Sequence, residues 1–361
     1  MEIVSTELKD IHKKVESKKR LSFEDGVQLF NSRDILSIGY MANIIREKKN
    51  GNIAYFVTNA HINYTNICIN RCQFCAFSKE KDEPGAYSMT IEDILNKGKN
   101  FINQNITELH IVGGLHPDLP FNYYLEMMTS LKKELPDIHI QAFTAVEIKH
   151  LSKIAGLSVK DTLLKLKQAG LGSIPGGGAE VFSPRVRENL CKEKIGSNEW
   201  LEVMKSAHEV GIKSNATMLY GHIETVEERV EHLIALRELQ DKTGGFQSFI
   251  PLAFHPKNTK LETLSSTTGF EDLKTLAVSR LMLDNFPHIK AFWIMIGTKL
   301  AQISLSFGVD DIDGTVMEEK ITHSAGASTA EYISRNNLIR LIREAGREPV
   351  ERDTLYNKIR N

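Results

Sequence analysis

The sequence predicts a parallel α/β barrel, either a closed (β/α)8 TIM-type barrel or a partly open relative. Two observations lead to this prediction. Short apolar strands alternate with amphipathic helices, and no internal repeat or Pro/Gly/Ser-rich linker interrupts the 361 residues. The expected strands are 61–66, 108–113, 138–144, 171–175, 212–219, 247–253, 289–295 and, as the weakest candidate, 303–309. In such folds the chemistry lies at the carboxyl ends of the strands.

Several helix starts between these strands carry capping signals. A Ser or Thr followed three residues later by an acidic residue can exchange hydrogen bonds with it. Such pairs are Ser22 with Asp25, Thr90 with Asp93, Ser158 with Asp161 and Thr225 with Glu228, and Ser197 can cap a helix that stops at Gly211. The ends of the chain have too few apolar residues for cores of their own. We therefore expect a helical extension over 1–50, the barrel over 51–314, and a helical extension over 315–361 packed on the barrel.

Composition and charge exclude some classes of function. A hydrophobic content of 41% with 25% charged residues is ordinary for a soluble globular protein. The net charge of -1 gives no reason to expect nucleic acid as a partner. No signal peptide and no run of eighteen apolar residues is visible. We expect a cytoplasmic protein with no membrane span.

Three of the four cysteines lie within eight positions, as Cys68-x3-Cys72-x2-Cys75, directly after the first expected strand. Thiolates suit iron–sulfur clusters, and a loop this short can place three of them around one cubane with one iron left open. The alternative is a zinc site completed by His61, His110 or Cys191. Zinc motifs usually present two separated ligand pairs, and no second pair exists here, so a cluster is favoured. Cys191 is expected not to be a ligand.

The cysteine spacing, with Phe74 before the last cysteine, resembles the radical S-adenosylmethionine (SAM) superfamily. The resemblance implies a [4Fe–4S] cluster on Cys68, Cys72 and Cys75 whose open iron chelates the amino and carboxylate groups of SAM. An electron from the cluster then breaks a C–S bond, which releases methionine and the 5′-deoxyadenosyl radical. It also makes Phe74 a neighbour of the adenine.

Two further stretches fit the same family. Gly113-Gly114 follows the second expected strand, where the superfamily has a glycine pair whose backbone receives the amino group of SAM. Glycine permits such close backbone approach. The run from Gly172 to Glu180 is rich in glycine but lacks the pattern of a phosphate-binding loop. Its Glu180 could accept hydrogen bonds from the ribose hydroxyls.

The resemblance narrows to one group, which contains aminofutalosine synthase, cyclic dehypoxanthine futalosine synthase and the FO synthase halves. The shared runs are 72–77, 175–180 and 221–225. Four more runs resemble the aminofutalosine synthase family within this group: 214–222, 249–256, 284–286 and 350–356. This implies a step of menaquinone biosynthesis. The radical adds to the alkene of 3-[(1-carboxyvinyl)oxy]benzoate, and rearrangement with decarboxylation gives aminodeoxyfutalosine.

The implied reaction needs partners for two substrate carboxylates and a one-electron donor such as reduced flavodoxin or ferredoxin. Arg71, inside the cysteine loop, and His222 and His255, which follow the fifth and sixth expected strands, are the catalytic candidates. Two alternatives stay open. One is a sibling reaction on the same scaffold, by the cyclase or an FO synthase half. The other is a zinc-stabilised barrel with a binding role.

Overall fold

The computed structural model describes residues 4–359 and contains two parallel sheets. The larger has seven strands in chain order: β2 (Asn59–Ile62), β3 (Glu108–Ile111), β4 (His139–Ala142), β5 (Ser173–Ile174), β6 (Lys213–Tyr220), β7 (Phe246–Ala253) and β8 (His288–Ile289). The smaller has the order β10 (Glu348–Glu351), β1 (Ile53–Val57) and β9 (Asp311–Gly314).

Backbone hydrogen bonds join both edges of the larger sheet to the segment that begins with β9. On the β8 side Ala291 N donates to Asp311 O at 2.8 Å, and on the β2 side His61 N donates to Met317 O at 2.8 Å. This segment therefore occupies the eighth position and closes the ring. The prediction of a (β/α)8-type barrel is confirmed.

The position of the eighth strand was predicted wrongly. Residues Thr298–Ser304 form helix α13, and a turn follows it, with Phe307 N bonded to Ser304 O at 2.8 Å. The alternating apolar residues of 303–309 fit the end of a helix as well as a strand. The eighth strand is β9. It was not predicted because it carries buried aspartates in place of apolar residues. The expected strand 289–295 is also shorter than predicted, because Trp293–Ile296 form helix α12.

Helices cover the outside of the ring. They are α4 (Ile91–Ile102), α5 (Phe121–Glu134), α6 (Ala145–Ala155), α7 (Val159–Ala169), α8 (Pro184–Cys191), α9 (Ser197–Glu209), α10 (Val226–Thr243) and α11 (Gly269–Met282). The predicted capping pairs form, for example Asp93 N to Thr90 Oγ1 at 3.1 Å. At α9 the cap is Gly196 in place of the predicted Ser197, which is the first helical residue.

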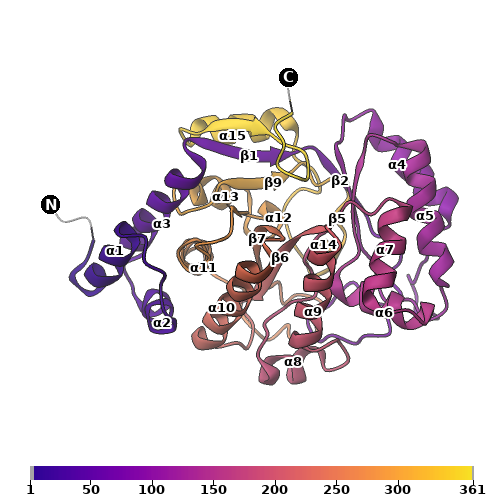
Figure 1. The fold of residues 1–361 in the computed structure, drawn as a ribbon, viewed down its shortest axis with the longest axis horizontal. Helices are drawn as coiled ribbons and strands as arrows, with labels where there is room; N and C mark the ends of the chain where they lie inside the picture. Colours follow the sequence, from indigo (N-terminus) through magenta and orange to yellow (C-terminus); the bar gives the residue numbers. More distant parts are fainter. Residues whose placement is uncertain (1–3, 360–361) are drawn as a thin grey trace.

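The two ends of the chain lie on different sides of the ring. Helices α1 (Lys9–Glu16), α2 (Phe23–Asn31) and α3 (Ile35–Asn50), preceded by the short η1 (Thr6–Leu8), gather at one end of the molecule, with α4 to α7 at the other (Figure 1). The C-terminal part holds α14 (Ile321–Ser324), α15 (Arg335–Glu344) and β10, which pairs with β1 beneath α15.

The expected helical extension over 315–361 thus also contains a strand, and neither β1 nor β10 was expected. The division of the chain at residues 50 and 314 stays a prediction. Residues 1–3 and 360–361 of the two extensions lie outside the described residues.

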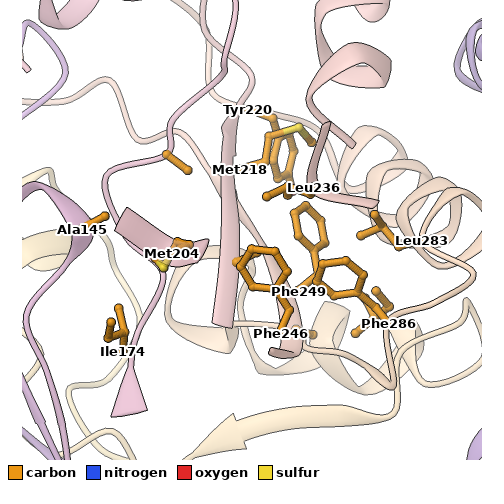
Figure 2. Close-up of a cluster of buried hydrophobic side chains, with 14 of the residues drawn as sticks. Ala145, Ile174, Met204, Met218, Tyr220, Leu236, Phe246, Phe249, Leu283 and Phe286 are labelled. Atoms are coloured by element: carbon orange, nitrogen blue, oxygen red, sulfur yellow. The ribbon is translucent and has the colours of Figure 1, made fainter. Parts of the chain in front are cut away.

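The two longest strands, β6 and β7, separate the apolar core from the barrel interior. On their outer side Phe246, Phe249 and Phe286 pack together beside Leu236 (Figure 2), and the Phe246 and Phe286 ring centroids are 5.3 Å apart. Side chains of a strand alternate between its two faces. In β6 the alternate residues Asn215 and Thr217 therefore face the inside of the ring, and this alternation positions part of the site. No helix between residues 4 and 359 is long and apolar enough to cross a membrane.

Candidate active site

One cavity of about 330 Å³ extends from the loops at the carboxyl ends of the strands into the barrel interior. Most of the predicted site residues line it: Cys68, Cys72, Phe74, Cys75, Gly113, Gly114, Glu180 and His255. Two predicted site residues, Arg71 and His222, do not. The cavity has two ends of different chemistry. We call the end with the cysteines the mouth and the end within the ring the interior.

Backbone hydrogen bonds hold the cysteine loop at the mouth. Cys68 N donates to Lys79 O at 3.1 Å, Cys75 N donates to Cys72 O at 3.1 Å, and Gln73 N donates to Leu190 O at 2.8 Å. These bonds fix the loop independently of any side-chain contact. Burial raises the pKa of the Cys72 thiol to about 12, so a bound metal is needed to keep it as a thiolate at neutral pH.

The donor set fits a four-iron cluster better than a single zinc ion. Among residues 4–359, no three His, Cys, Asp or Glu side chains lie close enough together to hold one metal ion. In a cubane each thiolate binds a different iron, so three cysteines around one wall of a cavity are sufficient. Two of the candidate ligands in the zinc alternative are His61 and His110. These two rings stack on each other inside the ring of strands, with their centroids 4.4 Å apart. Cys191 is buried at the end of α8 and does not line the cavity.

The glycine pair packs directly against the cysteine loop. Gly114 N donates to Thr65 O at 2.9 Å. A Cβ at Gly114 would overlap the carbonyl oxygen of Ile67 and lie 3.0 Å from Cys68 Cβ. Glycine is therefore required first by the chain itself, which brings two backbone segments together here. Substitution of Gly114 would disturb the cysteine loop as well as any ligand.

Glu147 holds the other glycine in place. Its Oε1 accepts hydrogen bonds from Gly113 N at 3.0 Å and from Tyr64 Oη at 2.8 Å. Its Oε2 accepts from Thr144 N at 2.7 Å, which completes the capping box of α6. Burial raises the pKa of Glu147 to about 7. Sequence reasoning missed this residue, although the spacing of Thr144 and Glu147 is the same capping signal that was recognised elsewhere.

A buried ion pair lies across the mouth from the glycines. Lys194 Nζ is 2.5 Å from Glu180 Oε1 and 5.0 Å from the centroid of the Phe74 ring. Although burial alone would lower it, the nearby Cys72 and Glu180 raise the pKa of Lys194 above its ordinary value. Sequence reasoning missed Lys194 because it closes a charged stretch, 187–194, that is typical of a solvated surface.

The interior end of the cavity is polar. It is lined by side chains from five strands and the segment after β8, namely Asn59, His61, Glu108, His110, Gln141, Asn215, Lys290 and Asp313. Lys290 Nζ lies 3.2 Å from Asp313 Oδ1. None of these residues belongs to a local motif, and each faces inward because of its place in a strand or at the end of one.

Comparison with known proteins agrees with this geometry. The family described as the radical SAM superfamily matches residues 62–236, and the region described as CofH/MqnC C-terminal matches residues 243–361. An aminodeoxyfutalosine synthase from Thermus thermophilus is 48% identical over 97% of this chain and 95% of its own length. The chain belongs to the radical SAM superfamily. This radical SAM enzyme therefore works with a [4Fe–4S] cluster and SAM.

The chain is also similar to a second bacterial synthase, to an enzyme with a different name and to a solved structure. An aminodeoxyfutalosine synthase from Streptomyces coelicolor is 44% identical over 98% of this chain and 94% of its own. A 5-amino-6-(D-ribitylamino)uracil–L-tyrosine 4-hydroxyphenyl transferase from Methanopyrus kandleri is 42% identical over 84% of both chains. Among solved structures, methylornithine synthase superposes with a TM-score of 0.74 at 18% identity, over 94% of this chain and 97% of that one. This last likeness shows the shared fold alone.

Of the three predicted catalytic residues of this radical SAM enzyme, only His255 lines the cavity. Its Nε2 lies 2.9 Å from Met295 O. Arg71 instead pairs with Glu80 at 3.2 Å on the outer side of the cysteine loop. The buried His222 uses both ring nitrogens within its own loop, with Nε2 2.9 Å from Leu219 O and Nδ1 2.8 Å from Glu224 Oε2.

Proposed function

We propose that this radical SAM enzyme is an aminodeoxyfutalosine synthase of menaquinone biosynthesis. Its substrate is 3-[(1-carboxyvinyl)oxy]benzoate, and its reaction joins the 5′-deoxyadenosyl group to the alkene carbon, with rearrangement and loss of carbon dioxide. The observation that carries the proposal is the near full-length identity of 48% and 44% to two bacterial aminodeoxyfutalosine synthases. A reduced flavodoxin or ferredoxin supplies the electron.

The residues at the mouth take the cofactors in this proposal. Cys68, Cys72 and Cys75 hold the cluster, which together with SAM supplies the 5′-deoxyadenosyl radical when both are bound. Because the N–H groups of Gly113 and Gly114 are already bonded within the chain, the pair presents carbonyl oxygens to the amino group of SAM.

The nucleoside of SAM lies on the opposite wall of the mouth. The Phe74 ring flanks the adenine. Glu180 faces the ribose hydroxyls and is held by Lys194 at 2.5 Å. A carboxylate fixed by an ion pair keeps one rotamer and remains an acceptor, as recognition of two hydroxyl donors requires.

The wall between mouth and interior is apolar. Ile250, Leu252, Phe292 and Met295 line the cavity between its two polar ends. An apolar wall would exclude bulk water and charged groups from the space between the adenosyl group and the alkene.

The catalytic candidates take different roles in this proposal. His255 follows β7 at the cavity wall, and its bond to the Met295 carbonyl fixes the ring, so we assign it to orientation of the substrate. His222 acts as a positioning residue for the loop after β6. His255→Ala should divert flux from product to 5′-deoxyadenosine, because a misplaced alkene lets the radical react elsewhere. His222→Ala should lower stability without changing this partition. If the ratio of product to 5′-deoxyadenosine is the same in the wild type and in both variants, His255 does not orient the substrate.

The deciding experiment follows the 5′-carbon of SAM. The enzyme is incubated anaerobically with dithionite, 3-[(1-carboxyvinyl)oxy]benzoate and SAM labelled at that carbon. The label should appear in aminodeoxyfutalosine, with carbon dioxide released mole for mole. Label found solely in 5′-deoxyadenosine would assign a hydrogen-abstracting sibling reaction instead. A parallel incubation with tyrosine and 5-amino-6-(D-ribitylamino)uracil should give no product, and conversion there would assign the activity named for the archaeal relative.

A further inference from the structure

Lys290 brings a positive charge into the interior end of the cavity. It follows β8 directly, and its backbone N donates to Phe249 O at 2.9 Å, which fixes the residue in the ring. The residue is 6% exposed and lines the cavity. Its Nζ contacts Asp313 Oδ1 at 3.2 Å. An ammonium group has three donors, and this contact uses one of them.

The other cations near the cavity have different partners. Within residues 4–359, Lys194 and Lys290 are the two lysines that line the cavity, and no arginine lines it. Lys194 belongs to the mouth and is paired with Glu180. Arg71 lies outside, against Glu80. Arg352, which is bonded to Asp311 Oδ2 at 2.6 Å, does not line the cavity. Lys290 is therefore the cation available to a ligand in the interior.

The proposed substrate requires hydrogen-bond donors at this end. It carries two carboxylates and an ether oxygen and has no donor of its own. Its alkene must face the mouth, where the adenosyl group is supplied, so the aryl carboxylate extends toward the interior. Beside Lys290, Asn215 also lines this end. The Asn215 Oδ1 accepts from Ser248 Oγ at 2.8 Å, which leaves its amide N–H groups as donors.

We propose that Lys290 binds the aryl carboxylate of the substrate, the carboxylate that the product retains. This inference rests on the proposed function and assigns to Lys290 the task that the sequence suggested for Arg71. Asp313 neutralises the ammonium group in the free enzyme, because an unpaired buried charge is costly. The substrate carboxylate then joins this pair as a second acceptor for the lysine.

The test compares two ligands in the SAM-free enzyme by equilibrium dialysis. One is 3-[(1-carboxyvinyl)oxy]benzoate, and the other is 2-phenoxyacrylate, which lacks the aryl carboxylate. Lys290→Met should weaken binding of the benzoate about 10- to 100-fold, the range for a lost charged hydrogen bond, and leave binding of 2-phenoxyacrylate unchanged. Lys290→Arg should recover part of the loss. Lys299→Met, an exposed lysine outside the cavity, is the matched control and should change neither ligand.

The outcomes separate this inference from the proposed function. If the wild type fails to convert the benzoate, the proposed function fails. If it converts the benzoate and Lys290→Met binds both ligands as the wild type does, or loses both equally, this inference alone is overturned. A second variant, Asp313→Asn, tests the proposal with an effect on binding in the opposite direction. Removing the competing carboxylate should leave benzoate binding equal or tighter, whereas weakening by the factor seen for Lys290→Met would contradict the assignment.

One further comparison does not depend on the stability of the lysine variant. The wild type itself should prefer the benzoate over 2-phenoxyacrylate by the same 10- to 100-fold. Equal affinity of the wild type for the two ligands would overturn the proposal even if Lys290→Met does not fold.

Discussion

The mouth and the interior of the cavity hold their polar groups in different ways. At the mouth, backbone hydrogen bonds fix the cysteine loop, and close backbone packing at Gly114 sets the distance between its two segments. The mouth also holds one buried ion pair, Lys194 with Glu180, on the wall across from the glycines. In and below the interior, side-chain ion pairs hold the polar groups throughout. Arg352 bonds Asp311, Lys290 bonds Asp313, and Arg280 bonds Asp310.

This difference predicts how each region responds to substitution. Backbone bonds persist when a side chain is exchanged, so side-chain exchanges in the cysteine loop should affect cofactors more than folding. Buried ion pairs depend on both members, and removal of one leaves an uncompensated charge. Changes in the interior should therefore affect stability as well as substrate. Substitutions in the two regions test this contrast.

The largest effect is expected at the cysteines. Cys68→Ala, Cys72→Ala or Cys75→Ala should each remove most of the iron and the broad visible absorbance of a reconstituted cluster. Cys191→Ala is the matched control, because it removes a buried thiol that does not line the cavity. Thermal unfolding of the cluster-free proteins should change little among the three variants. Loss of the cluster in Cys191→Ala, with one of the other three intact, would show that the ligand set is different.

The second effect concerns the buried pair beneath the interior. Arg352 is 1% exposed, its Nε lies 2.6 Å from Asp311 Oδ2, and its guanidinium stacks on the Tyr356 ring at 4.2 Å. Arg352→Ala should lower the free energy of unfolding by about 3–5 kcal/mol, because Asp311 would be buried without its partner. Urea denaturation measures the change.

The control for Arg352 is an exposed ion pair of the same kind. Arg340 and Glu344 form such a pair at 3.2 Å on the surface of α15. Arg340→Ala should cost less than about 1 kcal/mol. A loss at Arg352 no larger than this would show that the interior does not depend on its charges.

The third prediction is a pH dependence that arises at Glu147. Its carboxyl keeps its proton up to a pKa of about 7 in the folded state, whereas the unfolded chain loses it near the ordinary value of 4.5. Between these values the folded state binds more protons, so this residue lowers stability as pH rises, by about 3 kcal/mol in all.

Comparison with Glu147→Gln isolates this contribution. The difference in unfolding free energy between wild type and variant should change across pH 4.5–7 and stay constant above it. A constant difference over the whole range would show that the Glu147 carboxyl titrates normally in the fold.

The smallest effect is expected for a single methyl group at the mouth. Gly114→Ala places a Cβ against the Ile67 carbonyl and should cost about 1–3 kcal/mol through local overpacking. Because the displaced backbone leads into Cys68, iron content should fall together with SAM binding. Gly269→Ala, whose Cβ would make an ordinary 3.6 Å contact with Leu300, is the control and should change neither. Weaker SAM binding with full iron content would mean that the glycine serves the ligand alone.

Local features of the sequence determined much of the mouth and of the sheet. Strands β6 and β7 lie within one residue of the expected 212–219 and 247–253, because both are long and end in an apolar run. The cysteine loop and the glycine pair were readable because each is contiguous, and eight successive residues can surround one cofactor without help from the rest of the chain.

The interior was decided by the tertiary structure. Asp311 and Arg352 are 41 positions apart, and Lys290 and Asp313 are 23 apart. A charged residue is usually buried only when it is paired with another group. The residues next to it in the sequence do not show which distant residue will be that partner. For this reason β9 was missed as a strand and Arg71 was chosen over Lys290. Spacing along the chain placed the cysteines together, whereas closure of the ring placed Lys290 inside the cavity.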